Sequence, residues 1–260
     1  MKDVISEIKK DYIHQLGKQQ KRIDGRKFDE IRPIEIETGM IGTAEGSARV
    51  KLGKTVVMVG VKLGVGEPYP DAAGEGVLTT SAELNPLAAP EFDAGPPRED
   101  AIELARVTDR GIRESKAIDL EKLCIVEGEK VWVVYLDINV LDYDGNLYDA
   151  STLGALAALT VAKVPASTLG DGQEDFTLPI NHYPVACTAV KFGKIIVIDP
   201  TLDEENISDA RLTVTTDENG DIRAMQKGIG GSFTIPEVKE VIRLSQQTGK
   251  YIRENVINQV

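Results

Sequence analysis

Apolar residues recur along the chain with two spacings, one typical of helices and one typical of strands. Residues 1–17 place apolar side chains every four positions and end in a glycine, which predicts an amphipathic helix. Its apolar residues are Val4, Ile8, Tyr12 and Leu16, and Gly17 ends it. A polar and basic connector follows, so residues 1–21 are expected to form a separate N-terminal segment.

Strand-like runs follow between Ile31 and Leu84, with β-branched residues bounded by glycine, proline or polar residues. Gly53 separates the second run from the third in the manner of a hairpin. The proline-rich segment 84–97 predicts a surface loop, because proline cannot continue a strand or a helix. The four runs are residues 31–37, 46–52, 54–63 and 77–84.

The next segments predict a helix, a long strand and another helix. Residues 98–117 carry apolar side chains on one side of a helix, and residues 131–145 are typical of a long buried strand. Residues 147–164 consist largely of Ala, Leu and Gly, and such small side chains allow a helix to pack closely against a sheet. Pro165 ends this half of the chain.

The last part of the chain predicts two hairpins and a helix. One hairpin turns at Phe192 and Gly193, the other turns within residues 217–220, and the helix starts at Pro236. The chain is therefore expected to have an α+β fold of two subdomains, each a sheet covered by helices. The expected boundaries are 22–170 for the first subdomain, 171–184 for a linker and 185–260 for the second subdomain with its C-terminal helix.

Composition favours a soluble protein of the cytoplasm. The chain has 260 residues, 42% of them hydrophobic, and the apolar runs are too short to span a bilayer. The charged N-terminus lacks the apolar stretch of a signal peptide, and the two cysteines lack metal-ligand spacing. The net charge of −12 argues against diffuse binding of nucleic acid, so any such binding must be local.

Several common catalytic motifs can be set aside. The stretch Gly53, Lys54, Thr55 lacks the earlier glycine of a P-loop, since Ala48 stands there, and a strand follows where a helix is required. With only His14 and His182 available, a histidine-dependent triad or a histidine-rich metal site is not indicated.

An acidic cluster follows the apolar run 195–198. Acids at the end of a buried strand can hold a metal ion, so a metal-dependent hydrolase is one alternative function. An arginine, Arg211, stands just beyond the cluster and could instead neutralise part of it by pairing with Asp203, Glu204 or Glu205. The clustered acids are Asp199, Asp203, Glu204, Glu205 and Asp209.

Arginines form a stripe on the helix predicted at 98–117. Arg106, Arg110 and Arg113 fall within about 60° of arc at 100° per residue, which suits contact with successive phosphates of a single strand. A salt-bridged surface is the commoner explanation of such a stripe, because Asp109 can pair with Arg113 and Glu114 with Arg110. The pattern alone leaves both readings open.

Taken together, these segments resemble the RNase PH-like phosphorolytic exoribonucleases. The resemblance covers nearly the whole chain from Arg22 and rests on the order and spacing of its motifs. It implies the RNase PH fold, with a first subdomain related to the second domain of ribosomal protein S5. The motifs are RIDGR at 22–26, GSARVKLGKTVVMVGV at 46–61, SAELNP at 81–86, RVTDRGIRES at 106–115, LDINVLDYDGN at 136–146 and IIVIDPTLDEE at 195–205.

Within that family, the chain looks most like the non-catalytic RNase PH-like subunits of the archaeal exosome. The resemblance implies a hetero-hexameric ring, a trimer of heterodimers, in which this chain alternates with a catalytic RNase PH-like subunit. RNA-binding cap proteins and single-stranded RNA are further implied partners. Phosphate and magnesium are expected only at the partner's active site, so the resemblance assigns no cofactor, metal ligand or catalytic residue to this chain.

Two departures from the family pattern imply an inactive site. Active members hold phosphate in a turn at the start of the small-residue helix, where an arginine and a hydroxyl residue share the anion. Tyr148 and Asp149 stand at these positions. The catalytic aspartate of an Ala-Asp pair corresponds to Arg211, which follows Ala210 and cannot bind a cation or accept a proton.

The resemblance also favours an RNA role for the arginine stripe. It implies that Arg106 and Arg110 contact RNA bound at the partner's active site. Arg98 and Arg113 complete the candidate set, with Arg113 expected to be mainly structural. An autonomous phosphate-dependent exoribonuclease is the second alternative function, and it is opposed by Tyr148, Asp149 and Arg211.

Overall fold

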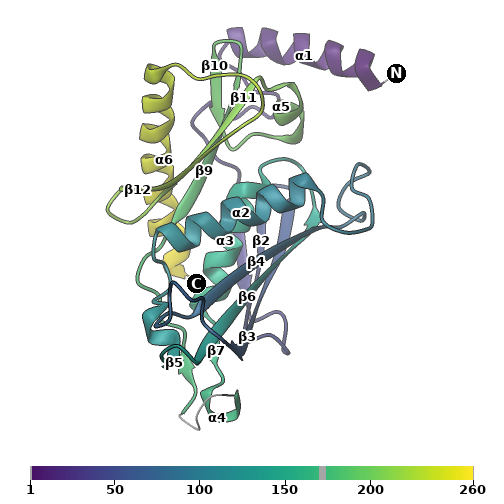
Figure 1. Ribbon diagram of the computed structural model, residues 1–260. Coiled ribbons are helices and arrows are strands. Elements are labelled where there is room, and N and C mark those ends of the chain that lie inside the picture. The colour runs from purple at the N-terminus through teal and green to yellow at the C-terminus, as the bar shows by residue number, and fades with distance from the viewer. Residues whose placement is uncertain (1, 170–173, 260) are drawn as a thin grey trace.

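The computed structural model describes residues 2–169 and 174–259, and the side chains of residues 9–169 and 174–258. Residues 170–173, at the junction of the predicted first subdomain and linker, lie outside the described residues. The chain forms two main sheets whose helices lie between and around them (Figure 1). This arrangement confirms the α+β class expected from the alternation of strand and helix patterns.

The first main sheet has six strands in the order β1-β2-β3-β6-β4, with β5 pairing with β6 at one end. All described pairs in it are antiparallel except β4 with β6, which is parallel. Strand β1 begins three residues later than predicted, since the N–H of Arg32 donates to Asp199 instead of to a neighbouring strand. The strands are β1 (Ile34–Thr38), β2 (Gly46–Leu52), β3 (Thr55–Gly66), β4 (Val77–Leu84), β5 (Cys124–Val126) and β6 (Lys130–Asp142).

The second main sheet has four strands in the order β10-β9-β11-β12, all antiparallel. Its central strand β9 is buried on both faces, because helices cover the sheet from both sides. The strands are β9 (Val185–Phe192), β10 (Ile195–Ile198), β11 (Ala210–Thr216) and β12 (Ile222–Gly228). A separate short pair joins β7 (Lys163–Val164) to β8 (Phe176–Thr177).

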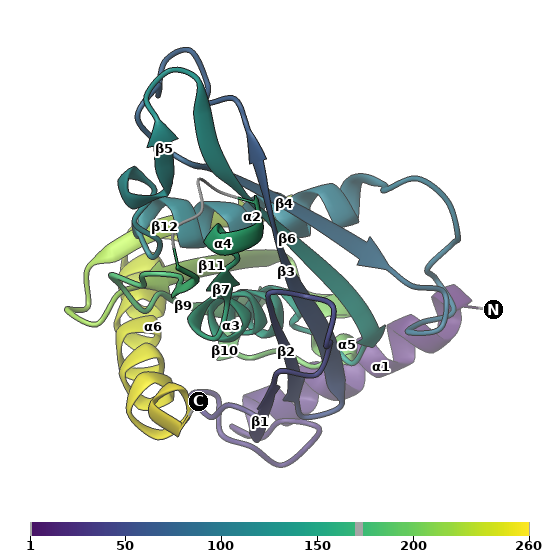
Figure 2. The same ribbon diagram turned by 90° about the horizontal axis from the view of Figure 1, so that it is seen from below.

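Helix α3 (Leu147–Thr160) lies between the two main sheets, and nearly all of its side chains are buried. Its small residues make this possible, since a Cβ added at Gly154 would lie 2.8 Å from Val59. Helix α2 (Glu99–Glu114) packs beside it, and helix α6 (Ile235–Asn255) covers the outer face of the second sheet (Figures 1 and 2). The N-terminus of α3 therefore lies where the two sheets meet.

Helix α1 (Lys2–Lys18) packs against the second sheet through a different face from the one predicted. Ile13 is buried against Phe192, whereas Tyr12 is exposed. The side chains of Val4 and Ile8 lie outside the described residues. Gly17 approaches Ile195 so closely that a Cβ would lie 2.3 Å from it, which fixes the rotation of the helix.

The remaining helices are short: α4 (Ala166–Leu169), α5 (Leu202–Ile207), η1 (Glu121–Leu123) and η2 (Ile257–Gln259). Within the described residues, no helix combines the length and apolar character needed to cross a bilayer.

Candidate functional site

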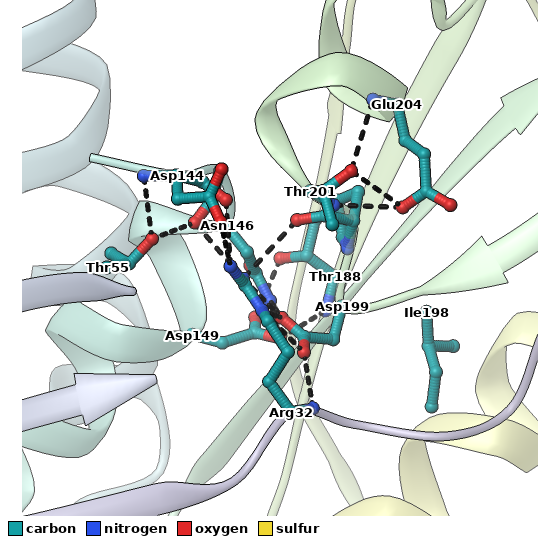
Figure 3. Close-up of polar contacts among 12 residues, drawn as sticks. Arg32, Thr55, Asp144, Asn146, Asp149, Thr188, Ile198, Asp199, Thr201 and Glu204 are labelled. Carbon is teal, nitrogen blue, oxygen red and sulfur yellow. Dashed lines mark hydrogen bonds and ion pairs between the residues drawn. The ribbon is translucent and has the colours of Figure 1, made fainter. Parts of the chain in front are cut away.

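The segments that carry the two departures meet between the two sheets. They are the turn before α3, the end of β10 with helix α5, and the start of β11. Figure 3 shows side chains from the first two of these segments. Asn146 turns the chain into α3 with a left-handed backbone, φ 58°. Gly145 is needed beside it, since a Cβ there would lie 2.5 Å from the backbone of Thr201.

Asp199 is the hub of this region and is 1% exposed. Its Oδ1 accepts from Nη2 of Arg32 and from Nδ2 of Asn146, each at 2.7 Å. Its Oδ2 accepts from the N–H of Arg32 at 2.7 Å and from Nη1 of Arg26 at 2.8 Å (Figure 3 shows the Arg32 contacts). Burial alone would raise the pKa of Asp199, but the hydrogen bonds and charges of Arg32 and Arg26 lower it below its ordinary value.

Glu204 is equally enclosed. Its two carboxylate oxygens accept from Nε and Nη2 of Arg22 at 2.9 and 2.6 Å, and both side chains are buried. Glu204 also completes a capping box with Thr201, the residue that caps helix α5. A long-range ion pair and a helix cap therefore share one carboxylate.

These contacts show that the acidic cluster is largely paired within the chain. The segment 202–207 is helix α5, and Asp199 and Glu204 are buried and paired with arginines from residues 22–32. Lys9 of α1 pairs with Asp203, so this acid is also engaged. In the described part of the chain, no three His, Cys, Asp or Glu side chains are grouped so that they could hold a metal ion.

Glu205 lies at the turn that opens α3. Its Oε1 accepts from the N–H of Asn146 at 2.9 Å, and its Oε2 accepts from the hydroxyl of Tyr143 at 2.8 Å. Burial raises the pKa of Glu205, and the bonds from Asn146 and Tyr143 oppose that rise. Glu205 thus accepts the backbone N–H of Asn146 at the turn where the family resemblance expects phosphate to bind.

Arg211 contacts Tyr148. The guanidinium carbon lies 4.1 Å from the centre of the tyrosine ring, and Nη2 donates to Oε1 of Glu103 at 2.6 Å. The expected pairing with Asp203, Glu204 or Glu205 is therefore wrong. Arg211 extends from the start of β11 toward α2, and Glu204 is already held by Arg22.

Asp149 points away from Arg211 and joins the two subdomains. Its Oδ1 accepts from the hydroxyl of Thr188 on β9 at 2.7 Å, and its Oδ2 accepts from the N–H of Thr188 at 3.0 Å. Nδ2 of Asn146 donates to the same Oδ2 at 2.8 Å. Burial raises the pKa of Asp149 to about 7, against the lowering effect of these hydrogen bonds.

The arginines of α2 differ in how far they are engaged. Arg113 donates to Asp109 and to the carbonyl of Leu78, so the predicted pair with Asp109 is confirmed. Arg110 donates to Gln226 on β12 at 3.3 Å and does not form the predicted pair with Glu114.

Two arginines are more accessible. Arg106 is exposed, and within the described residues its side chain has no hydrogen bond or ion pair. Arg98 precedes α2 and pairs with Asp93 at 2.8 Å, with 74% of its side chain exposed. The stripe therefore splits into a structural member, Arg113, and members that remain accessible to a ligand.

Comparison with known protein families identifies the family and the fold. Residues 30–165 match domain 1 of the 3' exoribonuclease family known as RNase PH, and residues 182–248 match domain 2. The chain belongs to the RNase PH family. The match confirms the predicted RNase PH fold and the family resemblance that was inferred from the motifs.

Individual proteins of this family are similar over nearly their whole length. The exosome complex component Rrp42 of Methanocella arvoryzae is 55% identical over 98% of this chain and 97% of its own. The Rrp42 of Thermoplasma acidophilum is 55% identical over 97% of this chain and 96% of its own. A chain of the Archaeoglobus fulgidus exosome with RNA bound to the active site superposes with a TM-score of 0.93, at 49% identity, over 96% of this chain and 98% of that chain.

The sequence motifs marked some residues of this region but did not show their contacts. The RIDGR motif marked Arg22 and Arg26 as part of the pattern without showing what they bind. Arg32 lies outside the quoted motifs, and Asn146 closes the motif at 136–146, which did not show what it binds. Their role depends on meeting Asp199 across the fold, and sequence spacing does not show such contacts.

Proposed function

We propose that this chain is a non-catalytic, RNA-contacting subunit of an exosome, a ring-shaped complex that degrades RNA from its 3' end. In the proposed ring, three copies alternate with a catalytic RNase PH-like subunit in the cytoplasm. RNA-binding cap proteins complete the complex. The catalytic subunit transfers the terminal nucleotide of single-stranded RNA to phosphate, and both phosphate and magnesium are bound there.

The contact between Arg211 and Tyr148 carries this proposal. Phosphorolysis must hold a phosphate dianion beside an RNA phosphodiester and needs a carboxylate for proton transfer or a metal ion. At the matching positions this chain has a guanidinium stacked on a phenol ring, and Glu103 neutralises the guanidinium. Nearby, Glu205 accepts the N–H of Asn146. An incoming phosphate would therefore meet a carboxylate at this turn.

The arginines of α2 support the RNA part of the proposal. Arg106 and Arg110 are exposed on a chain whose net charge is −12, so they form a local cationic feature on an otherwise repelling surface. Phosphate contacts of this kind contribute affinity without reading sequence. Arg98 adds a further accessible guanidinium before the same helix.

Activity assays of the purified chain test whether it lacks phosphorolytic activity of its own. Oligoadenylate, magnesium and phosphate are incubated with the chain alone, with its catalytic partner, and with both. We expect nucleoside diphosphate release only when the catalytic partner is present. Release by the chain alone would favour an autonomous exoribonuclease, and a mixture that forms no hexamer by native mass measurement would contradict the ring.

Charge reversal on α2 tests the RNA role. The double variant Arg106→Glu, Arg110→Glu is expected to weaken RNA binding by the assembled complex at least about tenfold, and to flatten its salt dependence. Assembly should be unchanged. Arg243→Glu on α6 is the matched control, since Arg243 is also an exposed helical arginine. Equal RNA affinity in the double variant and the control would return the stripe to a purely structural role.

A further inference from the structure

The departures at Tyr148 and Arg211 leave a cavity in place of the phosphate site. A cavity of about 140 Å³ lies between α2, the loop before it and the turn that opens α3. Its apolar lining includes Leu84 and Leu104, and its aromatic lining includes Phe92 and Tyr143. The rings of Phe92 and Tyr143 are stacked with centres 5.3 Å apart. The stacked pair therefore forms part of the wall of this pocket.

The charged groups around this cavity are predominantly acidic. Asp100, Glu205 and Arg211 line it, and Glu103 pairs with Arg211. Asp100, Glu205 and Glu103 thus contribute three carboxyl groups, and the guanidinium of Arg211 is the one cationic group among the described residues of the lining. The pocket thus disfavours an anion such as an RNA phosphate and favours a cation.

Asp100 is the available group in this lining. It is exposed in the first turn of α2, where the helix dipole favours its negative charge. Within the described residues its carboxylate has no hydrogen bond or ion pair, whereas Glu205 is held by Asn146 and Tyr143. A cation entering the pocket would find an open carboxylate at the rim and aromatic side chains in the wall, a combination that favours guanidinium or ammonium groups.

We infer that this pocket is a socket for an arginine or lysine side chain of the catalytic partner subunit. The identity of the partner rests on the proposed function. Chains of one fold commonly pair about a two-fold axis, which sets equivalent faces against each other. Helix α2 carries exposed arginines and also forms a wall of the pocket. In such a pairing the equivalent helix of the partner lies over this pocket, and one of its cationic side chains enters it.

Binding of a small probe to the chain alone tests the socket directly. Acetyl-arginine amide and its uncharged counterpart acetyl-citrulline amide are titrated into the ¹⁵N-labelled chain, and amide signals are followed by NMR. We expect saturable shifts of Leu104 and Tyr148 with the arginine compound, and affinity at least about tenfold weaker for the citrulline compound. Equal responses to both compounds, or no saturable shift with the arginine compound, would overturn the inference.

Two neighbouring acids in the first turn of α2 provide the matched variants. Asp100 lines the pocket and Glu99 does not, although both are acidic residues at the start of the same helix. Asp100→Asn is expected to weaken binding of acetyl-arginine amide about tenfold, and Glu99→Gln is expected to leave it unchanged. Stronger shifts of the same signals with adenosine monophosphate than with the arginine compound would assign the pocket to RNA instead.

Assembly of the two variants with the catalytic subunit distinguishes an error in the socket from an error in the proposed function. With the catalytic subunit, Asp100→Asn should raise the dissociation constant about tenfold relative to Glu99→Gln, with the difference shrinking at high salt. Equal assembly by both variants, with no arginine binding, would remove the socket and leave the function standing. Arginine binding by a chain that forms no complex would contradict the proposed function and the partner assignment, and leave a cation pocket.

Discussion

The guanidinium of Arg211 lies face-on against the ring of Tyr148, with its carbon 4.1 Å from the ring centre. The two residues come from different subdomains, since Arg211 begins β11 and Tyr148 lies in the first turn of α3. Both replace residues that the family resemblance assigns to phosphorolysis. The pair therefore forms a contact between the subdomains, and Glu103 completes it through its ion pair with Arg211.

Removal of this arginine should destabilise the fold. Arg211→Ala leaves Glu103 without its partner and exposes the Tyr148 ring, so we expect a loss of about 1–2 kcal/mol in the free energy of unfolding. Arg211→Asp should cost more, because the new carboxylate would face Glu103 and Glu205. Urea denaturation measures both variants, with Arg243→Ala as an exposed control. Wild-type stability in Arg211→Asp would contradict the structural role.

Periodicity predicted the helices and strands closely because each one is defined by local burial. The strand predicted at 46–52 became β2 with its predicted bounds. The small-residue helix predicted at 147–164 became the buried helix α3, which ends at Thr160, and residues 163–164 form strand β7 instead. The prediction for α1 was wrong about the buried face. Its docking depends on Ile13 meeting Phe192, a contact between segments distant in the sequence.

The acidic cluster shows where sequence reasoning ends. The sequence shows many carboxylates after β10. Whether each is buried or exposed depends on which basic side chains of distant segments pair with it. Glu204 is buried because Arg22, 182 positions earlier, returns to it. Motif matching predicted Tyr148, Asp149 and Arg211 as residues of a former site. It marked Arg26 without showing its contact with Asp199, and it did not mark Arg32.

The buried pair between Arg22 and Glu204 should be critical to stability. Removal of one member leaves the other as an uncompensated buried charge, so Arg22→Met is expected to cost about 3–5 kcal/mol. Lys9→Met is the matched control, since Lys9 pairs with Asp203 at the surface and should contribute less than about 1 kcal/mol. Chemical denaturation gives both values. Similar losses in the two variants would show that burial does not govern these pairs.

Two glycines should respond in opposite ways to alanine. Gly111 lies within α2, and a Cβ there would lie 3.5 Å from Thr215, an ordinary contact. Gly111→Ala should therefore stabilise the chain by about 0.5–1 kcal/mol by restricting the unfolded chain. A Cβ at Gly46 would lie 2.3 Å from the carbonyl oxygen of Ala158, so Gly46→Ala should destabilise it. Thermal unfolding checks the signs, and a lower melting temperature for Gly111→Ala would contradict the packing of α2.

The stability of the fold should depend on pH through Asp149. Its pKa is raised to about 7 in the folded chain from 3.8, so between these values the folded state binds more protons than the unfolded state. The contribution of this group to stability is thus present below pH 4 and is lost as the pH rises toward 7. Asp199 acts in the opposite sense, because its pKa is lowered and its contribution is lost only as the pH falls below 4.

Asp149→Asn should remove the pH dependence that arises from Asp149 and keep the one that arises from Asp199. The asparagine cannot ionise, and its carbonyl oxygen can still accept one hydrogen bond from Thr188. We therefore expect the variant to lose less stability than wild type between pH 5 and pH 8, by about 1.4 kcal/mol for each unit of pKa shift in that interval. Unfolding free energies from urea titrations at both pH values measure the difference. The same pH dependence in both proteins would show that Asp149 stays ionised in the fold, held by Thr188 and Asn146 despite its burial.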